Sequence, residues 1–117
     1  MNADEFRART KRFALKIIQF VEGLPDLGPA YVMGRQLVRA GTSVGANYRS
    51  ACRARSRADF IAKLKLVEEE CDESLYWLEL LGETGCKSRL PVADLKKEAE
   101  ELLSMVVASI KTARSPT

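Results

Sequence analysis

The sequence predicts an all-α protein: a single domain folded as an antiparallel, up-down-up-down four-helix bundle. Apolar residues recur in alternating steps of three and four over long segments, which is the spacing of one face of an α-helix. All four prolines, at positions 25, 29, 91 and 116, fall between or beyond these segments, where helices are expected to end. No segment shows the alternating pattern of a β-strand.

Four helices are expected, over residues 3–23, 29–54, 57–83 and 91–114. Helices of about 20–25 residues are roughly 30–38 Å long, and short connections between them favour antiparallel neighbours. The apolar stripe of the first helix consists of Phe6, Thr10, Phe13, Ile17, Phe20 and Leu24. A turn-rich segment, residues 23–28, separates it from the second helix.

The second helix is expected to continue through three glycines, Gly34, Gly41 and Gly45. Its stripe consists of Met33, Leu37, Ala40, Val44, Asn47 and Ala51. A glycine inside a helix costs about 1 kcal/mol relative to alanine, so we expect these glycines to allow a neighbouring backbone to approach closely or the helix to bend. A phosphate-binding loop would need a preceding strand and a terminal Gly-Lys-Ser/Thr, and the sequence has neither.

The third and fourth helices have their own start signals. Ser56, with Asp59 three positions later, predicts a capped start of the third helix. Pro91 is expected at the first position of the fourth, where a missing N–H costs nothing. The two stripes consist of Phe60, Leu64, Val67, Cys71, Ser74, Leu78 and Leu81, and of Leu95, Ala99, Leu102, Val106 and Ile110.

Composition bounds the class of protein. A chain of 117 residues, 46% apolar and 30% charged, can bury a core without disulfides or metals, as soluble globular proteins do. The first residues show no export signal, and no apolar run is long enough to span a bilayer. We therefore expect a cytoplasmic protein that does not associate with membranes.

The sequence contains no histidine and only three widely spaced cysteines, Cys52, Cys71 and Cys86. Without histidine, the Ser-His and Cys-His nucleophile pairs and the histidine-containing metal sites are excluded. The cysteines show no zinc spacing, so we expect them to be reduced. The sequence thus predicts no catalytic residues, no metal, no cofactor and no small-molecule substrate; an enzyme that uses lysine and carboxylates is the remaining alternative.

Positive charge is concentrated in the first half of the chain. Residues 1–57 hold eleven Lys and Arg against four Asp and Glu, a balance of +7, and residues 58–117 hold eight against twelve, a balance of −4. On a helical wheel, the arginines of the second helix form one ridge that faces away from the apolar stripe, and Arg57 would extend it. The ridge consists of Arg35, Arg39, Arg49 and Arg53.

Two interpretations of this ridge stay open. Guanidinium groups bind phosphate bidentately, so the ridge could follow the backbone of RNA or DNA. Alternatively it is a solvated surface that pairs with the acidic third helix, within one chain or between subunits, where each exposed pair is worth ~0–1 kcal/mol. The candidate residues of a subunit interface are Asn47, Glu69, Asp72, Glu73, Tyr76 and Trp77. A polar Asn47 on the apolar stripe would either fix helix register or hydrogen-bond backbone.

Three segments carry a resemblance to a known family. The run QLVRAGTSVGAN (36–47), the run RARSRADF (53–60) and the run EEECDESLYWLELL (68–81) resemble the four helix bundle protein family, also described as the 23S ribosomal RNA intervening-sequence proteins. The likeness extends over residues 11–114. Where many members have I-A-E-G, this chain has Tyr48-Arg49-Ser50-Ala51, so an acidic residue is lost and an arginine gained.

The resemblance implies a small bundle that assembles into a ring-like homopentamer. Some members are encoded in insertions within ribosomal RNA genes. A similar pentameric bundle is an accessory protein of diversity-generating retroelements, where a basic surface is associated with nucleic acid. The family supplies no catalytic residues to carry over. The partners we expect are therefore other copies of the same chain and RNA or DNA.

Overall fold

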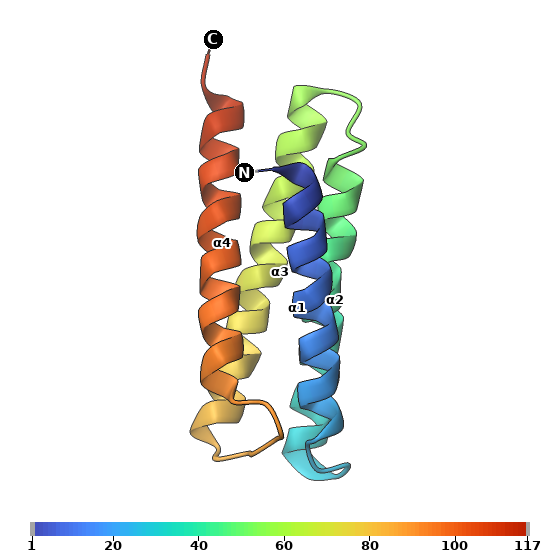
Figure 1. Ribbon diagram of the computed structural model, residues 1–117, viewed down its shortest axis with the longest axis vertical. Helices are drawn as coiled ribbons and strands as arrows, with labels where there is room; N and C mark the ends of the chain where they lie inside the picture. Colours follow the sequence, from blue (N-terminus) through green and yellow to red (C-terminus); the bar gives the residue numbers. More distant parts are fainter. Residues whose placement is uncertain (1, 117) are drawn as a thin grey trace.

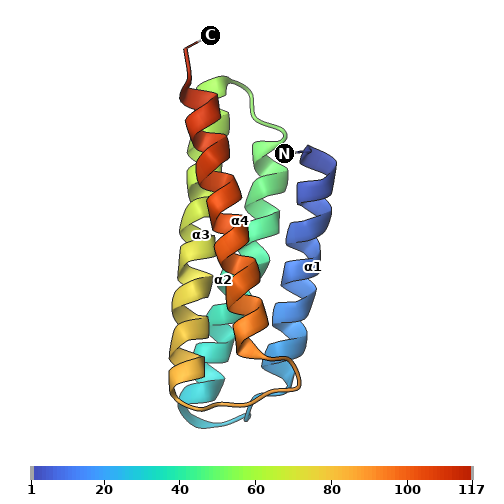
Figure 2. The same ribbon diagram turned by 60° about the vertical axis from the view of Figure 1, so that its left-hand side comes forward.

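The computed structural model describes residues 2–116, which contain four α-helices. They are α1 (Ala3–Glu22), α2 (Gly28–Ala51), α3 (Arg57–Glu83) and α4 (Val92–Arg114). The helices lie side by side and alternate in direction along an elongated molecule of 50 × 21 × 20 Å (Figures 1 and 2). Consecutive helices pack against each other, and α4 returns to pack on α1. The predicted all-α fold of four helices is confirmed.

The core is one continuous apolar seam to which every helix contributes. Its largest fully buried side chains are Phe6, Phe13, Ile17, Phe20, Leu37, Val44, Leu64, Val67, Leu78, Leu81, Leu102 and Val106. All of them belong to the stripes predicted from the spacing. Since burying one such side chain contributes roughly 1.5–3 kcal/mol, this seam is the main source of stability.

The glycines of α2 mark the closest approach between helices. A Cβ atom added at Gly41 would lie 3.0 Å from Cγ1 of Ile17 in α1, and one added at Gly45 would lie 3.1 Å from Oγ1 of Thr10. Both distances are tighter than ordinary van der Waals contact. The glycines therefore let the α1 and α2 backbones approach, which is the first of the two roles expected for them.

Ser56 caps the start of α3 as predicted. Oγ of Ser56 accepts a hydrogen bond from the backbone N–H of Asp59 at 3.0 Å. The Asp59 carboxylate does not return this bond to Ser56 but accepts one from the backbone N–H of Arg55 at 3.1 Å. This bond and one from Lys63 hold the pKa of Asp59 below its ordinary value.

Two helix boundaries differ from the expected ones. The second helix ends at Ala51 rather than at residue 54, because Ser56 has the extended backbone of a capping residue (φ −161°, ψ 167°) and the chain needs the residues before it to turn. Pro91 is also extended (φ −68°, ψ 130°) and precedes the first helical residue of α4 instead of occupying that position.

Because the helices are antiparallel, the three connections are divided between the two ends of the bundle. The α2–α3 connection lies at the same end as the start of α1 and the finish of α4 (Figure 1). The α1–α2 and α3–α4 connections lie together at the opposite end.

We predict that Gly41→Leu destabilises the bundle by about 2 kcal/mol or more, because the new side chain would overlap Ile17 and force α1 away from α2. Urea unfolding followed by circular dichroism measures the change. Ala62→Leu places the same side chain at an exposed helical position and is expected to leave the midpoint almost unchanged. Equal midpoints for the two variants would contradict the close approach.

Candidate nucleic-acid interface

The five predicted arginines are all exposed, but they do not form one ridge. Arg35, Arg39 and Arg49 lie on α2, whereas Arg53 lies in the turn that follows it and Arg57 is the first residue of α3. The prediction of one ridge requires a second helix that continues past residue 53. Because α2 ends earlier, Arg53 and Arg57 belong to a different part of the surface.

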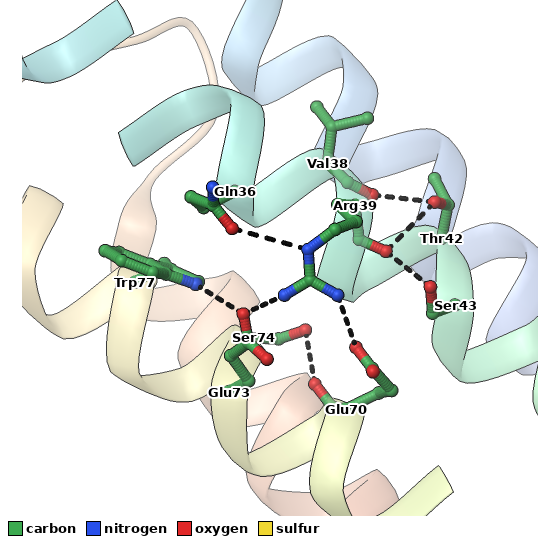
Figure 3. A network of polar contacts seen from close by, with 9 residues as sticks. All are labelled: Gln36, Val38, Arg39, Thr42, Ser43, Glu70, Glu73, Ser74 and Trp77. Carbon is green, nitrogen blue, oxygen red and sulfur yellow. Dashed lines mark hydrogen bonds and ion pairs between the residues drawn. The ribbon is translucent and has the colours of Figure 1, made fainter. Parts of the chain in front are cut away.

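Arg39 is held by side chains of its own molecule (Figure 3). Its guanidinium donates through Nη2 to Glu73 and through Nη1 to Oε2 of Glu70, at 3.5 Å, while Nε donates to Gln36 at 3.3 Å. The indole N–H of Trp77 donates to the same Glu73 carboxylate at 3.0 Å. This network joins α2 to α3 at the surface.

The pKa shifts follow from these contacts. The hydrogen bond from Trp77, and then that from Arg39, hold the pKa of Glu73 below its ordinary value of 4.5. The pKa of Glu70 is raised because burial disfavours its charged form. The hydrogen bond to Glu73 raises the pKa of Arg39. Arg39 therefore forms ion pairs with the acidic third helix of its own chain.

Arg35 lies one turn before Arg39 and has a different neighbour. Its guanidinium lies over the ring of Tyr31, with Cζ 5.7 Å from the ring centroid, and Nη1 donates to the Tyr31 hydroxyl at 3.1 Å. The tyrosine is itself exposed. Arg35 is thus an isolated exposed cation with an aromatic partner.

Five cations gather at the end of the bundle that carries the α2–α3 connection. We call this region the arginine end, and it consists of Arg53, Arg55, Arg57, Lys111 and Arg114. All five are exposed, and no ion pair described for residues 2–116 involves them. The chain has no acidic residue from position 27 to 58 or after position 101. The arginine end is therefore a basic surface whose five side chains have no ion-pair partner among the described residues; the nearest acidic residue in the sequence, Asp59, pairs with Lys63.

A second basic surface follows the seam between α1 and α2. This basic groove, of about 430 Å³, is bordered by Arg7, Lys11 and Arg49. Its floor is formed by small residues, among them Ala14, Gly45 and Ala46, and no carboxylate lines it. The structure therefore places Arg49 with the cations of α1. The wheel angle, about 80° away from Arg39, was the signal for this separation.

An acidic groove of about 510 Å³ follows the opposite seam, between α3 and α4. Glu68, Glu69 and Asp72 line it, together with Leu103 and Val107 of α4 and one lysine. Since α1–α2 and α3–α4 are opposite sides of a four-helix bundle, the basic and acidic grooves face away from each other. The charge asymmetry of the sequence thus becomes an asymmetry between two faces.

The predicted interface residues are distributed over several surfaces. Glu69 and Asp72 line the acidic groove, whereas Glu73 and Trp77 turn toward α2. Tyr76 is 53% exposed and its ring contacts Trp77 edge-on, with centroids 5.2 Å apart. Asn47 is partly exposed, and its side chain takes part in none of the hydrogen bonds described for residues 2–116.

The seam between α1 and α4 is closed by a charge cluster. Arg9 donates to both carboxylate oxygens of Glu98 and to Glu101, each at 2.8 Å, and its Nη1 lies 3.3 Å from Sδ of Met105. The hydrogen bonds to the two glutamates raise the pKa of Arg9. Arg9 is therefore committed to holding the bundle together.

Metal-ligating groups, reactive thiols and membrane-spanning segments bear on the class of protein in the part of the chain that the structure describes. No group of three or more acidic, cysteine or histidine side chains within residues 2–116 is placed to hold a metal ion. The buried thiol of Cys71 has its pKa raised to about 12 by burial, so it is un-ionised at neutral pH. None of the helices in this range is long and apolar enough to cross a membrane.

The fold and these surfaces define a small all-α bundle with charge segregated onto opposite faces. The model of the 23S rRNA-intervening sequence protein family matches residues 5–108, and the chain belongs to this family. A comparison with curated proteins finds no significant match.

A solved structure supports the same assignment. The chain is similar to a protein with unknown function from the S23 ribosomal protein family of Bacteroides thetaiotaomicron VPI-5482. The two are 34% identical with a TM-score of 0.82, and the match covers 95% of this chain and 99% of the other. The likeness therefore extends over the whole bundle.

We predict that Glu73→Gln lowers the free energy of unfolding by about 0.5–1 kcal/mol at neutral pH, since it weakens partly exposed contacts with Arg39 and Trp77. A carboxylate whose pKa is lowered by folding stabilises the fold above its ordinary pKa and loses this effect as the pH falls through the lowered value. Urea unfolding at about pH 7 and about pH 3 should therefore show the difference shrinking in acid.

Glu79→Gln is the matched control, because it removes an exposed charge from the same helix. A loss of stability that is the same for both variants, or that persists unchanged in acid, would show that the network around Arg39 contributes nothing specific.

Proposed function

We propose that the protein is a non-enzymatic, self-assembling bundle that binds the phosphate backbone of RNA or DNA through the arginine end. The observation that carries this proposal is the gathering of five exposed cations at one end of the molecule, none of which forms an ion pair among residues 2–116. The sequence predicts this function for a ridge along α2, whereas these five cations lie at the end of the bundle.

The chemistry of the arginine end suits phosphate. Four of its five cations are arginines, whose guanidinium groups remain charged and bind phosphate oxygens in pairs. Arg53, Arg55 and Arg57 alternate along a short connection and come from a segment without acidic residues. Such a surface releases counterions from nucleic acid, so its affinity should fall steeply with salt.

Recognition of this kind depends on charge and shape. The arginines lie on a turn and a helix start, and none of the helices has the features of a base-reading module. Arg39 contributes least, because Glu70 and Glu73 already occupy its guanidinium. Arg35 lies far from this end and would add only long-range attraction, whereas Arg49, in the last turn of α2, lies near it but lines the basic groove.

Self-assembly is supported by the two charged grooves. A basic groove on one side of the bundle and an acidic groove on the other are complementary between copies, which predicts a head-to-tail contact. Contacts of this type form a ring when the rotation closes and a filament when it does not. The ring-like homopentamer implied by the family resemblance is an assembly of this type.

A second candidate function follows from the same grooves. In this alternative the protein is a structural or protein-interaction module, and Arg49 with the other cations of the basic groove meets the acidic third helix of a neighbouring copy. The charged surfaces would then be used up in assembly, and no nucleic acid would bind. The two candidate functions differ in the role of the arginine end: the first assigns it to nucleic-acid binding, and the second gives it no role.

We predict that replacing Arg53, Arg55 and Arg57 by Gln weakens duplex RNA binding at least tenfold and reduces the slope of log affinity against log salt by about 2–3, because up to three phosphate contacts are lost. Fluorescence anisotropy at several salt concentrations measures both quantities.

The control for this triple variant is Lys87→Gln, Arg89→Gln and Lys96→Gln, which removes the same charge around the α3–α4 connection and the start of α4, at the opposite end. Similar losses in the two variants would assign the binding to net charge. An assembled wild-type protein that binds neither RNA nor DNA at low salt would exclude the first function and leave the second.

For assembly, we predict that Lys11→Glu with Arg49→Glu splits the oligomer, because the basic groove becomes acidic and repels its partner. Glu69→Lys with Asp72→Lys should split it from the other side. All four substitutions in one chain restore opposite charges and should restore the oligomer, as light scattering would show. Assembly that persists in both double variants would rule out this interface.

A further inference from the structure

A large hollow opens beside the arginine end. Its volume is about 950 Å³, and all four helices and the α2–α3 connection contribute to its lining. Figures 1 and 2 show why it exists: α3 and α4 extend beyond the start of α1, so one corner of the bundle is left without a helix.

The walls of the hollow are apolar with hydroxyl groups at intervals. Phe60 and Met105 are partly exposed and lie in its lining with several alanines, of which Ala113 is one. Ser56 and Ser109 add hydroxyl groups. The Ser56 hydroxyl accepts a hydrogen bond from the Asp59 N–H and can still donate, and the Ser109 hydroxyl donates to the Met105 carbonyl and can still accept. An aromatic ring, a thioether and small side chains form a surface on which a flat ring can lie, with hydroxyls for its polar edge.

The entrance to the hollow is cationic. Its Ala54 and Ser56 wall alternates in the sequence with Arg53, Arg55 and Arg57, and Arg7 lines it as well. The one carboxylate in its lining, Asp4, is paired with Arg7. A ligand that enters would therefore keep a flat apolar part inside and anionic groups among the arginines outside.

We propose that the arginine end binds single-stranded nucleic acid and that the hollow receives one unstacked base. This inference rests on the proposed function and names the form of nucleic acid. A base on a chain of phosphodiesters matches the arrangement found here, an apolar recess beside a row of cations. In a duplex the bases are stacked and paired, so a duplex reaches only the arginines.

The size of the hollow supports this assignment. Pockets that hold a small organic group commonly have volumes of about 300–1,000 Å³, so there is room for a nucleobase and its sugar. The walls also carry no free carboxylate to repel the adjoining phosphates. The basic groove between α1 and α2 has a comparable charge, but no aromatic residue lines it.

The experiment compares a single-stranded RNA of about 12 nucleotides, within the usual site size of single-strand binders, with a duplex of the same length. Ser109→Trp places an indole in the hollow without changing the charge. We expect it to weaken single-strand binding about tenfold, the effect of losing one stacked base, and to leave duplex binding within about twofold. Ser104→Trp, at an exposed position of α4 outside the hollow, should change neither.

A second measurement uses the unmodified protein. A single strand with 2-aminopurine at its centre should become more fluorescent when it binds, because an unstacked base is no longer quenched by its neighbours. This measurement decides the question if Ser109→Trp, and Ala113→Trp as its replacement, fail to fold by circular dichroism.

The outcomes separate the inference from the function on which it rests. Equal losses for single strand and duplex in Ser109→Trp, or no loss and no rise in fluorescence, would overturn the single-strand site while phosphate binding stands. Loss of the oligomer in Ser109→Trp, together with equal losses for the two nucleic acids, would overturn it in favour of a subunit contact. Absence of binding to either nucleic acid would overturn both proposals.

Discussion

The burial of four apolar stripes in one core determines the rest of this structure. Once the stripes of α1 to α4 face each other, the rotation of every helix is set, and so is the position of each charged side chain outside the core. The glycines of α2 tighten the arrangement, since Gly41 lets α1 approach within contact distance of the α2 backbone. The surfaces with proposed functions are what this packing leaves uncovered.

The charged side chains are grouped along the surface boundaries between neighbouring helices, here called the α1–α2, α2–α3, α3–α4 and α1–α4 seams. The α2–α3 seam pairs Arg39 with two glutamates, and the α1–α4 seam pairs Arg9 with two others, so both are internally neutralised. The α1–α2 groove has only cations at its borders, and the α3–α4 groove has mainly carboxylates. The charges along two seams are therefore neutralised within the protomer, and the charges along the other two are available for partners.

The sequence predicts the fold well, because each stripe can be identified within its own segment. It predicts the surfaces less well, because these depend on which helices are neighbours. The positions of Arg39 and Arg49 on the helical wheel follow from the sequence. The wheel does not show which residues they face, and the structure places Arg39 against Glu73 and Arg49 beside the cations of α1. The residue at which α2 ends depends on the cap of α3. The presence of the hollow depends on how far α3 and α4 extend beyond the start of α1.

The cluster around Arg9 also bears on how the bundle moves. The first and last helices pack least extensively among neighbouring helices, and no connection joins them. Their contact relies strongly on charge-assisted hydrogen bonds at the surface, which salt screens more than it weakens the apolar seam. Transient separation of α1 from α4 is therefore the easiest local opening of this bundle, and amide hydrogens along their facing sides would exchange with solvent ahead of those in α2 and α3.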